Sequence, residues 1–164
     1  MRLALAFGMA LAIGTTVSAA PVPEASLDRD ISRLVELFSD GQAYNDPAFR
    51  HVVYGKVFGG SRNDAIALFS IEGFQGGNLH AEYLAFFQAI EPQGGSAAQP
   101  FRLVAVTQIG GRGSRTFDWE TARLGPGGVR LVGKRWGPDD ASCCPSLPVS
   151  VSFRVKEGWV REGR

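Results

Sequence analysis

Two adjacent cysteines, Cys143 and Cys144, are the residues of this chain whose type and spacing are most specific for chemistry. In an oxidising compartment such a pair forms a vicinal disulfide, remains a free dithiol, or bonds to another chain. Adjacent α-carbons lie about 3.8 Å apart, less than the usual separation of about 4.4 to 6.8 Å, so ring closure strains the backbone and eases reduction. The pair therefore either stiffens its loop or acts as a thiol-active site that cycles between redox states or captures a soft metal.

The residues beside the two cysteines limit their reactivity. Asp139 and Asp140 carry carboxylates that raise thiol pKa values by like-charge repulsion, which opposes an activated nucleophile. Pro145 restricts the preceding cysteine to extended geometry, which limits the ring conformations open to it. We expect four residues of this loop to contact its neighbours or a ligand: Asp139, Asp140, Pro145 and Ser146.

A second candidate is the glycine-rich segment Gly110-Gly111-Arg112-Gly113-Ser114-Arg115. Arg112 and Arg115 could offer guanidinium groups to an anion, and both are candidate ligand contacts. The segment lacks the lysine and the strand-loop-helix context of a phosphate loop, however. A tight hairpin turn explains the same glycines and is the simpler interpretation.

Catalytic residue sets are sparse in this sequence. Asp118 and Glu120 are two residues apart on an expected strand, a spacing that could hold two carboxylates about 7 Å apart for hydrolysis. A solvated strand face explains the pair equally well. The two histidines, His51 and His80, have no metal-site spacing to the cysteines and form no recognisable serine-histidine-acid set. We therefore predict no metal, no cofactor and no catalytic residue.

The N-terminal segment has the pattern of an export signal. Arg2 precedes an almost wholly apolar run, residues 3–17, and Val17-Ser18-Ala19 supplies a cleavage site for signal peptidase. The run is shorter than the ~20 residues that span a bilayer, so no membrane span is expected after cleavage following Ala19. No cysteine follows the signal, which excludes a lipoprotein anchor there. We predict a periplasmic or secreted protein.

The charge balance argues against nucleic acid as a partner. Loss of the signal leaves 16 basic and 16 acidic residues in the mature chain, without a basic stripe to neutralise phosphates. About 145 mature residues suit one domain with its own core. We predict a signal peptide at 1–19, a linker at 20–26 and a single domain at 27–164.

Hydrophobic periodicity predicts an α+β fold, with one N-terminal helix packed on a mainly antiparallel meander sheet of about six to eight strands. The helix covers 27–38, where Ser26 can cap the first turn and Gly41 can end it. Short glycine-rich turns separate the strands, and turns of this length join antiparallel neighbours. The candidate strands are 51–58, 65–72, 80–90, 101–109, 114–124, 129–136 and 149–156.

The segment from about Asp64 to Val160 resembles a loose group of small exported bacterial proteins and lipoproteins of uncharacterised function that carry a Cys-Cys-Pro-Ser loop. The resemblance lies in that loop, in Asp64-Ala65 at a strand start, and in the motifs Gly76-Gly77-Asn78, Tyr83-Leu84-Ala85 and Gly137-Pro138-Asp139. Many members have an acidic, calcium-loop-like segment before the aspartate matching Asp64. Here that segment reads Gly59-Gly60-Ser61-Arg62-Asn63, so the resemblance implies no calcium site in this chain.

Export, balanced charge and the missing catalytic set favour a non-enzymatic binding module, of which an inhibitor or an immunity-like protein is one form. We expect the cysteine loop and the neighbouring sheet face to meet an unknown protein or envelope ligand. The alternative is a thiol-active envelope protein that uses Cys143 and Cys144. The aromatic residues Tyr83, Phe86, Phe87, Trp119 and Trp136 would form the core or line a ligand groove.

Overall fold

The computed structural model describes residues 24–91 and 100–163, so the predicted signal peptide lies outside the described residues. Within them, helix α1 (Glu24–Phe38) and a short 3-10 turn, η1 (Pro47–Phe49), precede a single sheet of eight strands. The strands are β1 (Arg50–Gly55), β2 (Asp64–Phe74), β3 (Leu79–Ala89), β4 (Phe101–Gly111), β5 (Arg115–Gly125), β6 (Gly128–Arg135), β7 (Leu147–Lys156) and β8 (Trp159–Gly163). Every neighbouring pair is antiparallel, and strand order follows chain order. This confirms the predicted α+β meander.

Helix α1 packs through the stripe that its periodicity predicts. Leu27, Ile31 and Leu34 are buried, and the Phe38 ring stacks on the Tyr83 ring of β3 with 5.0 Å between centroids. The helix begins at Glu24 rather than at Leu27, so Ser26 lies within its first turn instead of preceding it. Gly41 has φ +83°, the left-handed conformation expected of a glycine that follows a helix.

The sheet has apolar side chains on both faces, and each face builds a separate core. One face of β2 and β3 packs against α1, with Phe69 and Phe87 completely buried there. The other face packs against β5–β7, where Leu68 and Leu84 meet residues such as Phe117 and Phe153. Because side chains alternate along a strand, two-sided burial produces the continuous apolar runs seen in these central strands.

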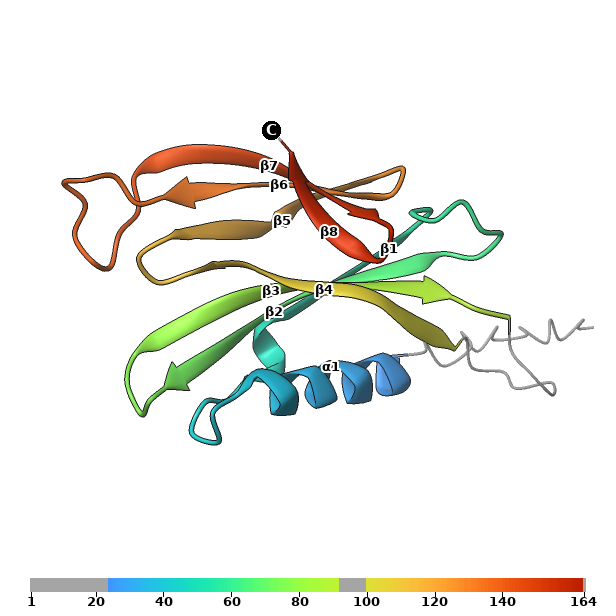
Figure 1. Cartoon of the computed structure of the whole chain (residues 1–164), viewed down its shortest axis with the longest axis horizontal. Helices are drawn as coiled ribbons and strands as arrows, with labels where there is room; N and C mark the ends of the chain where they lie inside the picture. Colours follow the sequence, from blue (N-terminus) through green and yellow to red (C-terminus); the bar gives the residue numbers. More distant parts are fainter. Residues whose placement is uncertain (1–23, 92–99, 164) are drawn as a thin grey trace, which may run out of the picture.

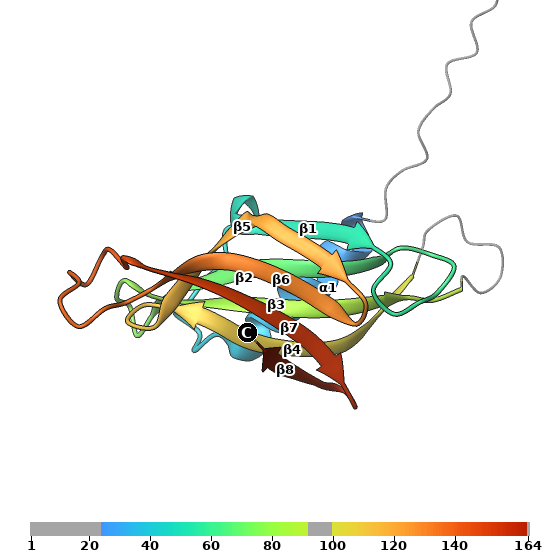
Figure 2. The same cartoon turned by 90° about the horizontal axis from the view of Figure 1, so that it is seen from above.

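The second core exists because the meander folds over on itself. Strands β4 and β5 share only one paired position, Gly111 with Arg115, and beyond it the chain leaves the plane of β4. As a result β5 contacts β1, and β8 contacts β4, although neither pair is adjacent in the sheet. Figure 1 shows the three resulting layers, α1, β1–β4 and β5–β8, and Figure 2 shows β5 beside β1.

The structure adds two details to the pattern expected from sequence. Strand β8 is absent from the candidate strands, and the tight turn before it, at residues 156–158, has positive φ at Glu157 and Gly158. Strand β2 begins with Asp64, whose buried carboxylate accepts backbone N–H groups of Val57 at 3.0 Å, Phe58 at 2.8 Å and Ala89 at 3.0 Å. Asp64 therefore organises the backbone at this end of the sheet.

Candidate functional site

The inner face of β2 and β3, which is turned toward β5–β7, changes from apolar to polar along its length. Successive inner positions pair across the two strands as Ile66 with Phe86, Leu68 with Leu84, Ser70 with Glu82, and Glu72 with His80. The first two pairs belong to the core between the sheet layers, whereas the last two bring polar side chains to the same face. The space between the layers is therefore dry at one end and polar at the other.

The polar end opens into a cavity of about 690 Å³. Its wall comes from β1, β2, β3 and β5 and from the segment that leads into β1. The lining includes four carboxylates, two histidines and four aromatic rings: Glu72, Glu82, Asp118, Glu120, His51, His80, Tyr44, Phe49, Phe117 and Trp119. Both histidines of the chain, which are far apart in sequence, thus line one site.

Glu82 lies at the back of the cavity and connects the two sheet layers. Its side chain accepts hydrogen bonds from the Thr116 hydroxyl and, at 3.0 Å, from the Phe117 backbone N–H, both on β5. The residue is only 5% exposed, and this burial raises the pKa of its carboxyl group although both hydrogen bonds act in the opposite direction. The buried indole N–H of Trp119 is directed toward the Glu82 carboxylate, but the two groups do not meet the geometry of a hydrogen bond.

The cavity mouth carries a second contact between layers. His51 Nδ1 on β1 lies 3.5 Å from Glu120 Oε1 on β5, and the Glu120 side chain is 84% exposed. Asp118 accepts the Glu120 backbone N–H at 3.2 Å, just before the irregularity in the pairing of β5 with β6. The Asp118 and Glu120 pair expected from sequence therefore does line a cavity, together with His51.

One basic residue of the lining directs its charge away from the cavity. The Arg50 guanidinium donates to Asn45 Oδ1 at 2.5 Å, to the Asp28 carbonyl at 3.3 Å and to Ser32 Oγ at 3.2 Å. Two of these acceptors belong to α1, on the opposite side of the first sheet layer. The Arg50 charge therefore serves the helix contact.

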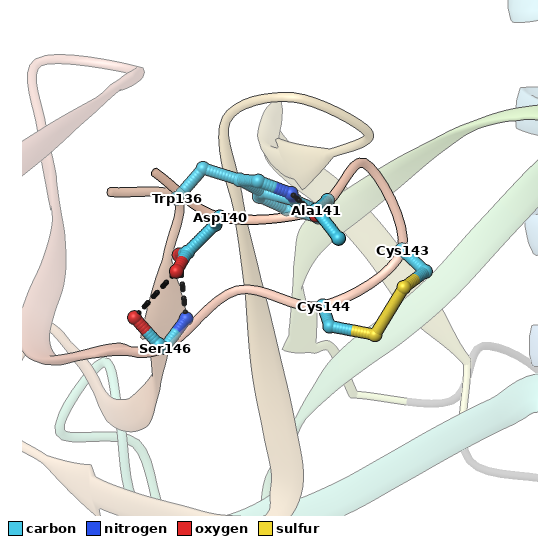
Figure 3. Close-up of a disulfide and its surroundings, with 6 residues drawn as sticks. All are labelled: Trp136, Asp140, Ala141, Cys143, Cys144 and Ser146. Carbon is cyan, nitrogen blue, oxygen red and sulfur yellow. Dashed lines mark hydrogen bonds between the residues drawn. A yellow bond between two sulfur atoms is a disulfide. The ribbon is translucent and has the colours of Figure 1, made fainter. Parts of the chain in front are cut away.

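The cysteine loop is a separate structure between β6 and β7. Cys143 and Cys144 form a vicinal disulfide, and both residues are exposed (Figure 3). The Asp140 carboxylate accepts the Gly137 N–H at 2.7 Å, the Ser146 N–H at 2.8 Å and the Ser146 hydroxyl at 2.7 Å. These bonds, the Gly137 N–H first, hold the pKa of Asp140 below its ordinary value.

The other predicted loop residues have different surroundings. The Trp136 indole donates to the Ala141 carbonyl at 3.1 Å, which fixes the chain just before the disulfide. Asp139 is exposed and Pro145 is half-buried. None of the four predicted contacts, Asp139, Asp140, Pro145 and Ser146, belongs to the lining of the cavity.

The glycine-rich segment is the hairpin turn between β4 and β5. Arg115 makes a bidentate ion pair with Glu162 of β8, at 2.7 and 2.6 Å, and donates to the Ile109 carbonyl at 2.5 Å. Its guanidinium also lies 5.3 Å from the centre of the Phe117 ring. Arg112 donates to the Asn78 carbonyl at 3.3 Å, beside the cavity. Arg115 thus joins β4, β5 and β8.

Sequence analysis assigned no site role to Glu72 or Glu82, and it placed His51 and His80 in no metal site and no catalytic set. A signal for them exists in the period-two pattern: on β2 and β3 the polar residues Ser70, Glu72, His80 and Glu82 continue the phase of buried apolar positions. Polar residues in core phase indicate either a buried network or a cavity. Of the five predicted aromatics, Trp119 lines the cavity, whereas Phe86 and Phe87 are core residues on opposite faces.

No family model, curated protein or solved structure matches this chain. Among the described residues, no three His, Cys, Asp or Glu side chains are placed to hold a metal ion. Nor is any described helix long and apolar enough to cross a membrane. The interpretation of function therefore depends on the geometry of the cavity and the cysteine loop.

Proposed function

We propose that this chain is an exported binding module, periplasmic or secreted, whose ligand site is the cavity between the sheet layers. The observation that carries the proposal is the lining: carboxylates, imidazoles and aromatic rings converge there from four different strands. Side chains on paired strands are held in place by the ladder, and ligand sites commonly combine apolar walls with a few fixed polar groups. The volume of about 690 Å³ lies within the usual range of about 300 to 1,000 Å³ for small-molecule sites.

A substitution at the cavity mouth tests this proposal. Asn78 lies in the lining and is exposed, so Asn78→Trp places a bulky ring over the opening without entering a core. Wild-type protein incubated with envelope extract should retain a ligand mass in native mass spectrometry, and that ligand should raise Tm because it binds only the folded state. The Asn78→Trp variant should bind with a Kd at least about tenfold weaker, or about 1.4 kcal/mol, and should therefore retain much less of the ligand at the same ligand concentration.

The matched control is Ser114→Trp, which adds the same ring at an exposed position of the β4–β5 turn. This variant should retain the ligand as the wild type does. Equal retention by Asn78→Trp would place binding elsewhere on the molecule. Failure of the wild type to retain any ligand from envelope extract would count against the binding module itself.

The exposure of Cys143 and Cys144 favours a second candidate function, that of a thiol-active envelope protein. Thiol exchange requires access to a sulfur atom, and this disulfide is on the protein surface. Alkylation of the mature protein before and after reduction, followed by intact mass measurement, gives the redox state in the envelope. A mixture of reduced and oxidised chains that responds to envelope oxidants would support this function, whereas a fully oxidised pair under all conditions would oppose it.

A further inference from the structure

We propose that the cavity binds the ammonium group of a small organic amine. This inference rests on the proposed function and adds the chemical class of the ligand. It follows from three properties of the cavity: its charge, its exposed aromatic rings and an indole N–H in its wall that lacks a well-formed hydrogen bond.

The first property is an excess of acidic groups. Four carboxylates line the cavity, on Glu72, Glu82, Asp118 and Glu120, together with the two histidines. Four carboxylates against one guanidinium give the lining an acidic composition. That guanidinium, which belongs to Arg50, is bonded toward Asn45 and α1. A ligand entering this space therefore meets a negative potential, which attracts cations and repels carboxylates and phosphates.

The second property is the aromatic character of the cavity. Tyr44 is 58% exposed and Phe49 is 55% exposed, so both rings are accessible to a ligand at the cavity. Trp119 adds an indole to the wall beside the carboxylates. Alkylammonium groups bind to aromatic faces through the ring quadrupole, and the aliphatic part of an amine gains from contact with the same rings. Inorganic cations would use only the carboxylates.

The third property concerns hydrogen bonds. The Trp119 indole nitrogen is buried and faces the Glu82 carboxylate, but it makes no hydrogen bond of good geometry within the described part of the chain. An indole N–H can only donate, so it calls for an acceptor atom. A neutral amine nitrogen, hydroxyl or carbonyl elsewhere on the ligand would supply that acceptor, while an ammonium group donates to the carboxylates. The site therefore matches an elongated amine with more than one polar atom better than a simple spherical ion.

Spermidine is a suitable probe for this proposal, because it combines ammonium groups with a flexible aliphatic chain. Octanediol and suberate, of similar length, serve as the neutral and the anionic comparison. Each compound is titrated into the mature protein at constant ionic strength while amide NMR chemical shifts are followed. Spermidine should shift residues of the cavity wall and saturate, whereas suberate should not.

Two variants separate a defined site from general charge attraction. Glu72→Gln with Glu120→Gln removes two negative charges from the lining and should weaken spermidine binding at least about tenfold, or about 1.4 kcal/mol. Asp139→Asn removes an exposed carboxylate of the cysteine loop, outside the cavity, and should leave the affinity unchanged. Equal weakening by both changes, or shifts spread over the whole surface, would overturn the proposal. Thermal unfolding of each variant shows that the fold is retained.

The ammonium group could also belong to a lysine side chain, so a short blocked peptide, acetyl-Gly-Lys-Gly-amide, forms another arm of the experiment. Binding of the peptide in preference to spermidine would assign the site to a protein partner and overturn the small-amine assignment. Saturable binding of octanediol or suberate in the cavity would show that the ligand need not be cationic, which would overturn this inference but not the proposed binding function. Absence of binding by every probe, together with a ligand retained from envelope extract, would refute the inference alone.

Discussion

Glu82 in the cavity and Asp140 in the cysteine loop are both carboxylates that hold backbone N–H groups, yet their pKa values shift in opposite directions. Asp140 accepts three hydrogen bonds at a site open to solvent, so its charged form is stabilised. Glu82 accepts two and is almost wholly buried, so desolvation of the charge prevails. The comparison distinguishes a carboxylate satisfied by its own loop from one whose charge is incompletely compensated.

This difference has a functional meaning. The ionised Asp140 is already stabilised by three hydrogen bonds from its own loop, so a ligand has less to add there. The ionised Glu82 would gain from any cation that enters the cavity, since a positive charge would offset the cost of burial. A cation bound in the cavity would therefore stabilise the ionised form of Glu82.

The largest loss of stability is expected from a substitution that crowds the Glu82 side chain. At Gly110 an added Cβ would lie 2.7 Å from Glu82 Oε2 and 2.7 Å from the Arg115 carbonyl oxygen. Gly110→Ala should lower the free energy of unfolding by about 3 kcal/mol, because backbone must move to make room. Urea unfolding measures the change. Gly125→Ala, where an added Cβ meets nothing within 4 Å, is the control and should have little effect.

Removal of the Glu82 carboxylate should have the next largest effect. Glu82→Ala leaves the Phe117 N–H and the Thr116 hydroxyl without their acceptor and should cost about 2 kcal/mol of unfolding free energy. Equilibrium unfolding in urea again provides the measurement. If Glu82→Ala were as stable as wild type, water or a shifted side chain would satisfy these donors, and the connection between the layers would not depend on Glu82.

The dependence of the unfolding free energy on pH should report the raised pKa of Glu82. Because the folded-state pKa of Glu82 is raised above its ordinary value of 4.5, the folded chain retains this proton longer than the unfolded chain does. The stability that Glu82 contributes is thus complete below its unfolded pKa and declines as pH rises through the raised value. Unfolding of wild type and Glu82→Gln between about pH 4 and pH 7 should show the wild-type advantage shrinking with pH. A constant difference would mean that burial does not perturb this carboxyl group.

The disulfide should matter less for global stability. A bond between adjacent residues closes a very small loop, so it restricts few conformations of the unfolded chain, and Cys143→Ser with Cys144→Ser should cost at most about 1 kcal/mol. Thermal unfolding of the double variant is the test. A loss comparable to that of Glu82→Ala would show that the loop supports β6 and β7 far more than its exposed position indicates.

The smallest effect is expected from Asp140→Asn. The amide keeps one acceptor oxygen and loses the charge that holds Gly137 and Ser146, so the loop should loosen while the sheet remains intact. Global unfolding should change less than in the double cysteine variant. The rate at which dithiothreitol reduces the disulfide should increase, and an unchanged rate would show that Asp140 does not control access to the sulfur atoms.

The features that the sequence predicts depend on residues close together in the chain, whereas the features it does not predict depend on contacts between distant residues. The helix stripe at Leu27, Ile31 and Leu34 and the hairpin turns are local patterns, so the α+β meander follows from the sequence. Strand β8 is short and mostly exposed, and Arg161, Glu162 and Gly163 show no alternation, so the sequence pattern does not predict a strand there.

The cavity depends on contacts that no local pattern encodes. His51 and Glu120 meet only because the sheet folds over between β4 and β5 and brings β5 beside β1. Because the cavity residues are far apart in the sequence, they form no recognisable motif. Cys143 and Cys144 are adjacent and do form one. Glu82 was detectable only as a polar residue in the phase of Leu84 and Phe86.

The single paired position between β4 and β5 also has a consequence for the association of chains. Strands β5–β8 form one contiguous C-terminal segment, and they cover β1–β4 almost entirely through side chains. If the turn at residues 112–114 were extended, this segment of one molecule would fit over β1–β4 of a second, with Leu131 and Phe153 meeting the same partners as before. Such an exchange would give up little more than the Gly111–Arg115 pairing and would rebuild each cavity from two chains, since Glu82 and Trp119 lie on opposite sides of that turn.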